Sequence, residues 1–275
     1  MSVATGSPVH TVLCDLDGVV WLAGVPIPGS VEAIDKLRAA GRRVVFVTNS
    51  SAPTIAEHTA ALAAVGIEAS GDVISSATAA AALVSPGERV LVCGGAGVHE
   101  AVLSAGAVSI DGSDEAGAAD GVDAVVVGLH RTFDYERLRI AVAALQRGAR
   151  FIACNRDPLF PTPAGRVPGA GAIVAALAAS AQREPEVAGK PHRAAAEAVA
   201  AHLGISLDDD AAFIRGLVMV GDQVSTDGLF AELLACRFAL VRTGNTAPAA
   251  AIEMDAAFDG FDLSAVASAM LATGE

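Results

Sequence analysis

The sequence has few aromatic and few basic residues. Aromatics make up 4% of the 275 residues, and 18 lysines and arginines stand against 31 acidic residues, which gives a net charge of −13. No basic run and no basic stretch rich in aromatics is present, so we expect no nucleic-acid partner. Because aromatic residues are few, the core must come from Val, Leu, Ile and Ala, and the hydrophobic content of 53% supplies them. An acidic chain also repels phosphorylated substrates at long range, so a phosphate site would need local positive charge.

Long apolar runs, a leader pattern and metal-type cysteine spacing are missing as well. No uninterrupted apolar stretch reaches the ~18 residues that a membrane-spanning helix needs. The first ten residues have neither the basic nor the apolar region of a signal peptide. We therefore expect a soluble, cytoplasmic protein without a membrane partner. The four cysteines show no CxxC spacing and are expected to be buried, reduced thiols: Cys14, Cys93, Cys154 and Cys236.

Segments typical of strands and helices alternate along the chain, which favours a mainly parallel α/β sheet. Strands are expected at 10–15, 43–48, 89–93, 124–128, 150–153 and 237–241, with another beginning at Leu217. Helices are expected at 30–40, 55–65, 76–84, 98–105, 135–146, 170–181, 192–203, 226–234 and 263–271, the first with Ser30 as N-cap. Loops are expected at 111–121 and 155–168. The glycine-rich segment 94–97 lacks GxGxxG spacing, which favours a tight structural turn over a dinucleotide site.

A short acidic segment ends the first of these strands: Val12-Leu13-Cys14-Asp15-Leu16-Asp17-Gly18-Val19. Asp15 and Asp17 are two residues apart and therefore share one face of the strand. Gly18 allows the chain to turn sharply after them. Like charges this close repel, and a bound cation or phosphoryl chemistry would make the pair useful. The segment alone is equally compatible with a solvated turn.

Three later segments add groups that can bind anions or cations. Thr48 offers a hydroxyl and Asn49 a backbone N–H to an anion, although a strand, a turn and a helix start explain the same residues. Lys190, in the tripeptide GKP before a helix, can hold its ammonium over a phosphate or be an ordinary surface lysine. Asp222 suits a hard cation and Asp227 follows about one turn later, although both also fit the start of a helix.

Taken together and in this order, strand–DxDG, strand–TNSS, GKP–helix and strand–GDxxxTD resemble the motifs of the haloacid dehalogenase (HAD) superfamily in its phosphatase form. The segments 127–135, 153–158 and 167–171 look like cap landmarks of the NagD-like, p-nitrophenyl phosphatase branch (subclass IIA). The resemblance covers about residues 10–245. It implies a Rossmann-like doubly wound parallel sheet formed by residues 1–78 and 183–275, with an inserted α/β cap of the C2 type at 79–182. The chain would return from the cap at 182–185.

The resemblance also implies roles for the site residues. Asp15 would be the nucleophile that forms an aspartyl-phosphate, and Asp17 would protonate the leaving oxygen and then activate water. One Mg²⁺ would be held by Asp15, Asp222 and the backbone carbonyl of Asp17, with Asp227 binding it directly or through water. The phosphoryl oxygens would contact a catalytic hydroxyl, a catalytic ammonium and the loop after the second strand: Thr48, Lys190, Asn49 and Ser50. Three cap-loop residues would recognise the leaving group: Asn155, Arg156 and Asp157.

The resemblance, with these residues in place, implies a Mg²⁺-dependent phosphatase that hydrolyses a small phosphorylated metabolite. Two other functions stay open: a non-catalytic phosphometabolite-binding module, against which the intact acidic pair argues, and a phosphotransferase of the same fold. The spacer Gln223-Val224-Ser225 departs from the basic or amide-rich run of many relatives but leaves the neighbouring acids in place, so we expect catalysis to be retained. A homodimer through the cap is expected by analogy only.

Overall fold

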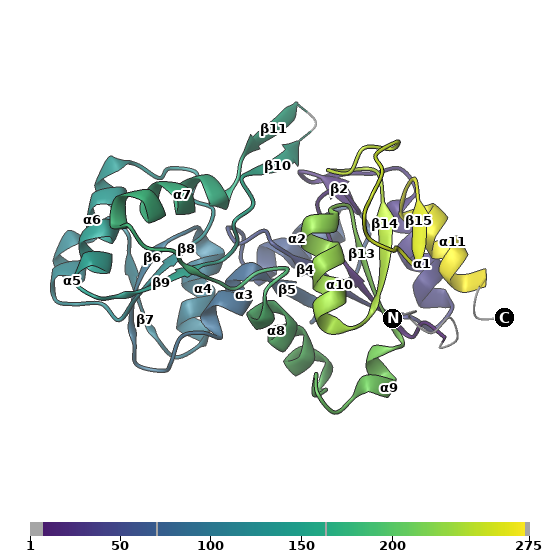
Figure 1. Ribbon diagram of the computed structural model, residues 1–275, viewed down its shortest axis with the longest axis horizontal. Coiled ribbons are helices and arrows are strands. Elements are labelled where there is room, and N and C mark those ends of the chain that lie inside the picture. Colours follow the sequence, from purple (N-terminus) through teal and green to yellow (C-terminus); the bar gives the residue numbers. More distant parts are fainter. Residues whose placement is uncertain (1–7, 70, 163, 273–275) are drawn as a thin grey trace.

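The computed structural model describes residues 8–69, 71–162 and 164–272, which fold into two α/β lobes that lie side by side (Figure 1). Most of the N-terminal segment without a leader pattern, and the predicted domain limits at residues 1 and 275, lie outside the described residues. Within the described part of the chain, no helix is both long and apolar enough to cross a membrane.

The first lobe is built on a six-stranded parallel sheet in the order β15-β14-β13-β1-β4-β5. The chain adds strands first on one side of β1 and later on the other, so the order reverses between β1 and β13. The strands are β1 (Thr11–Cys14), β4 (Arg43–Thr48), β5 (Val73–Ser75), β13 (Leu217–Gly221), β14 (Arg237–Val241) and β15 (Phe258–Gly260). A small antiparallel hairpin, β2 (Trp21–Leu22) with β3 (Val25–Pro26), follows β1.

Helices cover both faces of this sheet because side chains along each strand alternate between two apolar clusters. In β1, Val12 and Cys14 belong to one cluster and Leu13 to the other. The first face is covered by α1 (Ser30–Ala39), α2 (Ile55–Ala64) and α11 (Leu263–Ala272). The second is covered by α8 (Arg193–Leu203), a π-helical turn (Val224–Gly228) and α10 (Leu229–Leu234), while the short helix α9 (Ala211–Ile214) precedes β13. The four cysteines are free and buried, as the sequence predicts.

The second lobe contains a five-stranded parallel sheet in the order β12-β9-β8-β6-β7, which reverses between β6 and β8. Its strands are β6 (Arg89–Cys93), β7 (Val108–Asp111), β8 (Ala124–Val127), β9 (Arg150–Ala153) and β12 (Glu186–Val187). One face packs against α5 (Glu115–Ala119), α6 (Tyr135–Gln146) and α7 (Ala170–Ala181), and the other against α3 (Ser76–Ala81) and α4 (Ala96–Ser104). The antiparallel hairpin β10 (Leu159–Thr162) with β11 (Gly165–Pro168) projects beside the junction of the lobes (Figure 1).

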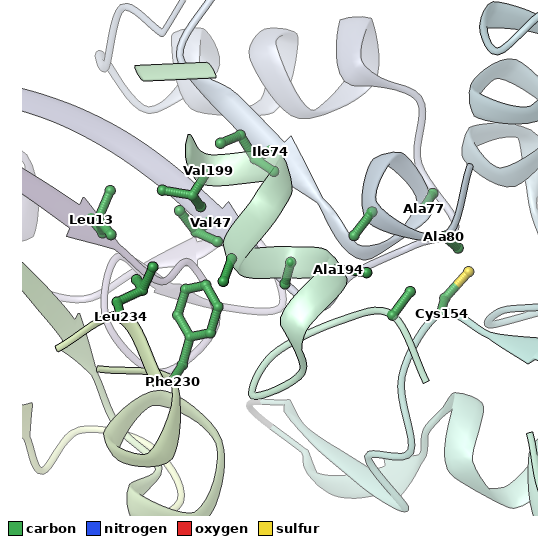
Figure 2. Close-up of a cluster of buried hydrophobic side chains, with 14 of the residues drawn as sticks. Leu13, Val47, Ile74, Ala77, Ala80, Cys154, Ala194, Val199, Phe230 and Leu234 are labelled. Carbon is green, nitrogen blue, oxygen red and sulfur yellow. The ribbon is translucent and has the colours of Figure 1, made fainter. Parts of the chain in front are cut away.

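One apolar cluster continues from the first lobe into the second. It joins Leu13 and Val47 of the first sheet to Cys154, which follows β9, through residues of α3 and α8 (Figure 2). Domains joined by small polar contacts move freely, whereas a contiguous apolar contact resists their separation. The cluster therefore fixes the orientation of the second lobe over the edge of the first sheet.

The fold is the expected α/β class, a doubly wound parallel sheet with an inserted α/β cap. Several local expectations were wrong. The first helix is capped by Gly29 at a φ of 81° and not by Ser30. The expected loop 111–121 contains α5, because the Asp114 carboxylate accepts a hydrogen bond from Gly117 N–H and caps a short helix.

Two further differences concern the junction between the lobes. The expected loop 155–168 forms the β10–β11 hairpin, since a two-stranded edge tolerates the prolines that argued against strands there. The strand β12 pairs with β9, so the chain returns to the first sheet after Val187 and not at 182–185. The division into residues 1–78 and 183–275 against 79–182 stays a proposal.

Candidate active site

The candidate site lies where the strand order of the first sheet reverses. Asp15 and Asp222 directly follow the neighbouring strands β1 and β13, and Thr48 ends β4 on the other side of β1. The carboxyl ends of parallel strands meet at one edge, and the reversal leaves a crevice there. Lys190 reaches the same place from the segment that returns from the second lobe. A cavity of about 320 Å³ opens at this edge and is lined by residues of both lobes.

Lys190 joins two of the acids. Its Nζ lies 2.9 Å from Asp15 Oδ1 and 2.7 Å from Asp227 Oδ1. The exposed fraction is 2% for the Lys190 side chain, 13% for Asp15 and 1% for Asp227. Burial alone would lower the pKa of the Lys190 ammonium, but the two carboxylates outweigh burial and raise that pKa above its usual value. Lys190 is therefore a permanent positive charge among buried acids.

Three carboxylates gather around this lysine. Asp15, Asp222 and Asp227 each present an oxygen, and these oxygens lie within 4.8 Å of one another. Asp227 uses both oxygens within the protein, because Oδ1 binds Lys190 and Oδ2 accepts a hydrogen bond from Gln223 N–H at 3.2 Å. Asp15 uses Oδ1 for Lys190, and Asp222 Oδ2 accepts from the backbone N–H of Asn245. Asp15 and Asp222 therefore each keep one oxygen for a cation.

This arrangement leaves negative charge without full compensation. Burial raises the pKa of Asp15 well above its usual 3.8, and the nearby Asp227 and Asp222 add to the shift while Lys190 opposes it. Burial and the charge of Asp227 raise the pKa of Asp222 to about 7, against the hydrogen bond from Asn245. Such shifts mean that the folded chain favours a proton or a cation here. Carboxylate oxygens at this spacing are the donors that Mg²⁺ prefers, so the residues fit that ion.

The Asp17 carboxylate stands apart from this group. It accepts hydrogen bonds from the backbone N–H of Ala23, at 3.3 Å, and from the Trp21 side chain. Burial nevertheless raises the pKa of Asp17 to about 6. A carboxyl group with this pKa exchanges protons readily near neutral pH. Asp15 and Asp17 line the same cavity. Asp15 is paired with Lys190, whereas Asp17 is suited to proton transfer.

The loop after β4 supplies hydrogen-bond donors to the cavity. Ser50 N–H donates to the Thr48 hydroxyl oxygen at 3.0 Å, which leaves the Thr48 hydroxyl hydrogen for an anion. Asn49 donates its side-chain amide to Asp157 Oδ2 at 2.9 Å and to the Lys190 carbonyl at 3.0 Å. Thr48, Asn49 and Ser50 all line the cavity. The predicted phosphate-binding residues are therefore brought together with Lys190.

Two of the three cap-loop residues predicted to recognise the leaving group line the cavity. Asn155 and Asp157 do so, but the side-chain amide of Asn155 is engaged within the protein. Its Nδ2 donates to the Asn49 carbonyl at 2.7 Å, and its Oδ1 accepts a hydrogen bond from Asp157 N–H at 3.1 Å. Arg156 lies outside the cavity lining, and its guanidinium pairs with Glu184 at 2.9 Å on the surface. The structure therefore gives Arg156 no contact with the site.

Gly18 and Gly221 are among the glycines that allow the backbone to approach the acids closely. Gly18 has a φ of 89°, and a Cβ there would lie 2.6 Å from the carboxyl carbon of Asp222. A Cβ at Gly221 would overlap the Asp227 carboxylate. Any larger residue at either position would displace a site carboxylate, and at Gly18 it would also strain the backbone.

Asn245, His58 and Arg131 are among the cavity residues that sequence patterns did not reveal. Asn245 lies near the end of the expected family resemblance, in a segment where the Thr243 hydroxyl also donates to the Gly18 carbonyl at 2.6 Å. The glycine at 244 is the signal that could have found it, because a glycine after a strand end often marks close backbone approach. His58 lies in α2, outside the predicted site segments, and Arg131 lies in the cap landmark 127–135, for which no site role was predicted.

Comparison with known proteins gives consistent matches. The family model described as haloacid dehalogenase-like hydrolase matches residues 12–108, and one described as HAD-hydrolase-like matches residues 187–262. Together these stretches contain Asp15, Asp17, Lys190, Asp222 and Asp227. Phosphoglycolate phosphatase 2 of Arabidopsis thaliana is 32% identical over 260 residues, covering 86% of this chain and 84% of the relative.

Solved structures match over nearly the whole chain. The p-nitrophenyl phosphatase from Archaeoglobus fulgidus has a TM-score of 0.82 at 27% identity, covering 96% of this chain and 100% of its own. The glycerol phosphate phosphatase from Mycobacterium tuberculosis, in complex with magnesium, has a TM-score of 0.81 at 32% identity, covering 94% of this chain and 77% of its own. Both lobes are therefore shared with these proteins.

Proposed function

The chain belongs to the haloacid dehalogenase-like hydrolases, in their NagD-like p-nitrophenyl phosphatase branch, and is a phosphoric monoester hydrolase; on this basis we propose that it hydrolyses a small phosphorylated metabolite through an aspartyl-phosphate. One observation carries the proposal. The Lys190 ammonium lies 2.9 Å from Asp15 and 2.7 Å from Asp227, at the sheet edge where α/β proteins bind ligands.

In this proposal two acids share the chemistry. An oxygen of Asp15 attacks phosphorus, and the bond from phosphorus to the leaving oxygen breaks. Asp17 gives its proton to that leaving oxygen and then takes a proton from a water molecule. The oxygen of that water attacks phosphorus, the bond between phosphorus and the Asp15 oxygen breaks, and inorganic phosphate and the free Asp15 carboxylate are released. A pKa of about 6 suits Asp17 to both transfers. The Thr48 hydroxyl, the Asn49 backbone N–H and the Lys190 ammonium hold the phosphoryl oxygens and stabilise their charge.

We also propose Mg²⁺ as the cofactor. Asp15 and Asp222 would bind it through the oxygens that they keep free, and Asp17 through its backbone carbonyl. Asp227, with both oxygens engaged, would act through water. When bound, the ion supplies positive charge that offsets repulsion between the acids and a phosphate. The magnesium complex of the Mycobacterium tuberculosis relative supports this choice.

The cavity supports a small substrate. Its volume of about 320 Å³ is at the lower end of the range for small-molecule sites. Relatives are named for phosphoglycolate and for glycerol phosphate, so these two compounds are the first candidates.

The homodimer through the cap stays a prediction.

Phosphate release tests this function. Purified protein with Mg²⁺ should release phosphate from p-nitrophenyl phosphate and from at least one of phosphoglycolate and glycerol 3-phosphate. Asp15→Asn should lower kcat by about a thousandfold or more. Asp35→Asn, on the exposed face of α1, is the matched control and should keep full activity. Full activity in Asp15→Asn, or no turnover of any of these phosphomonoesters by the unaltered chain, would contradict the proposal.

A further inference from the structure

The turns at the carboxyl ends of three second-lobe strands meet one loop of the first lobe. We call this loop, residues 49–55 after β4, the clamped loop; its residues 49–53 line the active-site cavity. The turns follow β6, β8 and β9, which are adjacent in the second sheet. At the reversal between β6 and β8 an α/β sheet offers a crevice for a ligand. In this chain that edge is filled by the clamped loop.

Backbone groups after β6 and β8 hold the middle of the clamped loop. Gly97 N–H donates to the Ala52 carbonyl at 2.8 Å, and Leu129 N–H donates to Ser51 Oγ at 3.0 Å. Ser51 has no exposed surface. Because a buried hydroxyl with a backbone partner has a fixed position, Ser51 anchors the loop to the second lobe.

Groups from α4 and from the segment after β9 hold the two ends of the loop. At the start, Asn155 Nδ2 donates to the Asn49 carbonyl at 2.7 Å. At the end, Glu100 Oε1 accepts a hydrogen bond from Ile55 N–H at 2.9 Å, in the first turn of α2. The second lobe therefore contacts the clamped loop along its whole length.

The contacts are close enough to require glycine on the second lobe. A Cβ at Gly97 would overlap the Pro53 carbonyl, and a Cβ at Gly128 would lie 2.7 Å from Ser51 Oγ. A Cβ at Gly95 would lie 2.7 Å from the Ala52 carbonyl oxygen. The glycine-rich turn 94–97, which resembles no nucleotide loop in its spacing, is thus shaped to receive a protein backbone.

We propose that the second lobe is a fixed clamp whose strand-end turns position the phosphate-binding backbone of the first lobe. Ser51, Gly97 and Glu100 are then positioning residues for phosphoryl transfer, acting through the Asn49 N–H and the Thr48 hydroxyl. This inference rests on the proposed phosphatase function. It also means that the second lobe does not lift away from this face during turnover, since lifting would break the hydrogen bonds that hold the phosphate-binding loop.

Gly97→Ala tests the clamp directly. Alanine is the better helix former in α4, so the change favours its own helix while pushing against Pro53. A displacement of the loop by about 1 Å should lower kcat/KM for p-nitrophenyl phosphate by ten- to a hundredfold. The dissociation constant of inorganic phosphate, measured by calorimetry with Mg²⁺, should rise in parallel. Ser104→Ala, on the exposed face of the same helix, is the matched control and should change neither value.

A pair of variants at Glu100 keeps the test decisive if Gly97→Ala does not fold. Glu100→Ala removes the acceptor for Ile55 N–H, whereas Glu100→Gln keeps one. The clamp predicts a loss of about two- to tenfold in kcat/KM and in phosphate affinity for Glu100→Ala. Glu100→Gln should restore both, which a general loss of stability would not produce.

The outcomes separate the clamp from the enzymatic proposal. Wild-type turnover together with unchanged phosphate affinity and kcat/KM in Gly97→Ala and Glu100→Ala would overturn the clamp alone. Absence of wild-type turnover would overturn the phosphatase proposal. In that case the calorimetric phosphate affinities of the same variants would still support or overturn the clamp.

Discussion

Replacing Lys190 with methionine should reveal the electrostatic cost of the active site. The change keeps the side-chain length but removes the ammonium that lies 2.9 Å from Asp15 and 2.7 Å from Asp227. Removing one partner of a buried charge pair leaves the other unpaired, so the free energy of unfolding without divalent cations should fall by about 3–5 kcal/mol at neutral pH. A loss of this size is a large share of the total stability of an ordinary domain.

The loss should depend on pH in a defined direction. Burial already raises the pKa of Asp15 in the folded protein above its unfolded value of 3.8, and removing Lys190 raises it further. The folded variant then binds a proton more tightly than the unfolded chain does, so its stability rises as the pH falls. The deficit relative to wild type is therefore largest above the folded pKa of Asp15 in the variant, and it shrinks as the pH falls from that value toward the folded pKa of Asp15 in the wild type. Mg²⁺ should also reduce the deficit, because it supplies charge to the same acids.

Urea unfolding at about pH 8 and about pH 5.5, with and without Mg²⁺, measures these differences. Lys36→Met is the matched control, because Lys36 is the other lysine of the sequence and is exposed on α1. It should change the free energy of unfolding by no more than about 0.5 kcal/mol. A Lys190→Met deficit below about 1 kcal/mol at both pH values, or one that neither acid nor Mg²⁺ reduces, would refute the reasoning.

Three further predictions follow from the same geometry. Since the pKa of Asp17 is about 6, its acid form is lost as the pH rises through this value. Glycerol 3-phosphate has a poor leaving group that needs the Asp17 proton, whereas p-nitrophenyl phosphate has a good one. Above pH 6, kcat/KM for glycerol 3-phosphate should therefore fall more steeply than kcat/KM for p-nitrophenyl phosphate. A chelator should abolish phosphate release, and Asp222→Asn should raise the Mg²⁺ concentration for half-maximal activity by about tenfold or more. Arg156→Ala should keep kcat/KM within about twofold for every substrate, because its exposed pair with Glu184 lies outside the cavity; a larger, substrate-dependent loss would restore the predicted role in recognising the leaving group.

The sequence predicts the gathering of distant acids because strand geometry alone determines it. Asp15 and Asp222 each follow a wholly buried strand, and parallel strands bring their carboxyl ends to one edge. No knowledge of packing is needed for that step. The pattern likewise predicts the bounds of α6, α7 and β9, whose ends coincide with clear changes in hydrophobicity.

The sequence does not predict the contacts that depend on how the lobes pack. Ser51 belongs to the TNSS segment, but nothing in that segment indicates its contact with Leu129, and Asn245, which holds Asp222, is marked only by the glycine before it. Arg156 and Asp157 are adjacent in a loop, yet one faces Glu184 and the other faces Asn49. Only the path of the backbone decides between them. Short elements such as β12 fail for a related reason, since their pairing with a neighbouring strand defines them more than their own residues do.

The charges around Lys190 bear on how an acidic chain binds phosphate, as the proposed function requires. Three carboxylates around one ammonium leave two negative charges in excess when all are ionised. A phosphate dianion entering this group alone would meet repulsion at short range, where the low dielectric strengthens it. A divalent cation held by Asp15 and Asp222 would cancel this excess. Phosphate affinity should therefore be weak until the cation binds, and the raised pKa values of Asp15 and Asp222 in the cation-free chain reflect the same unmet demand.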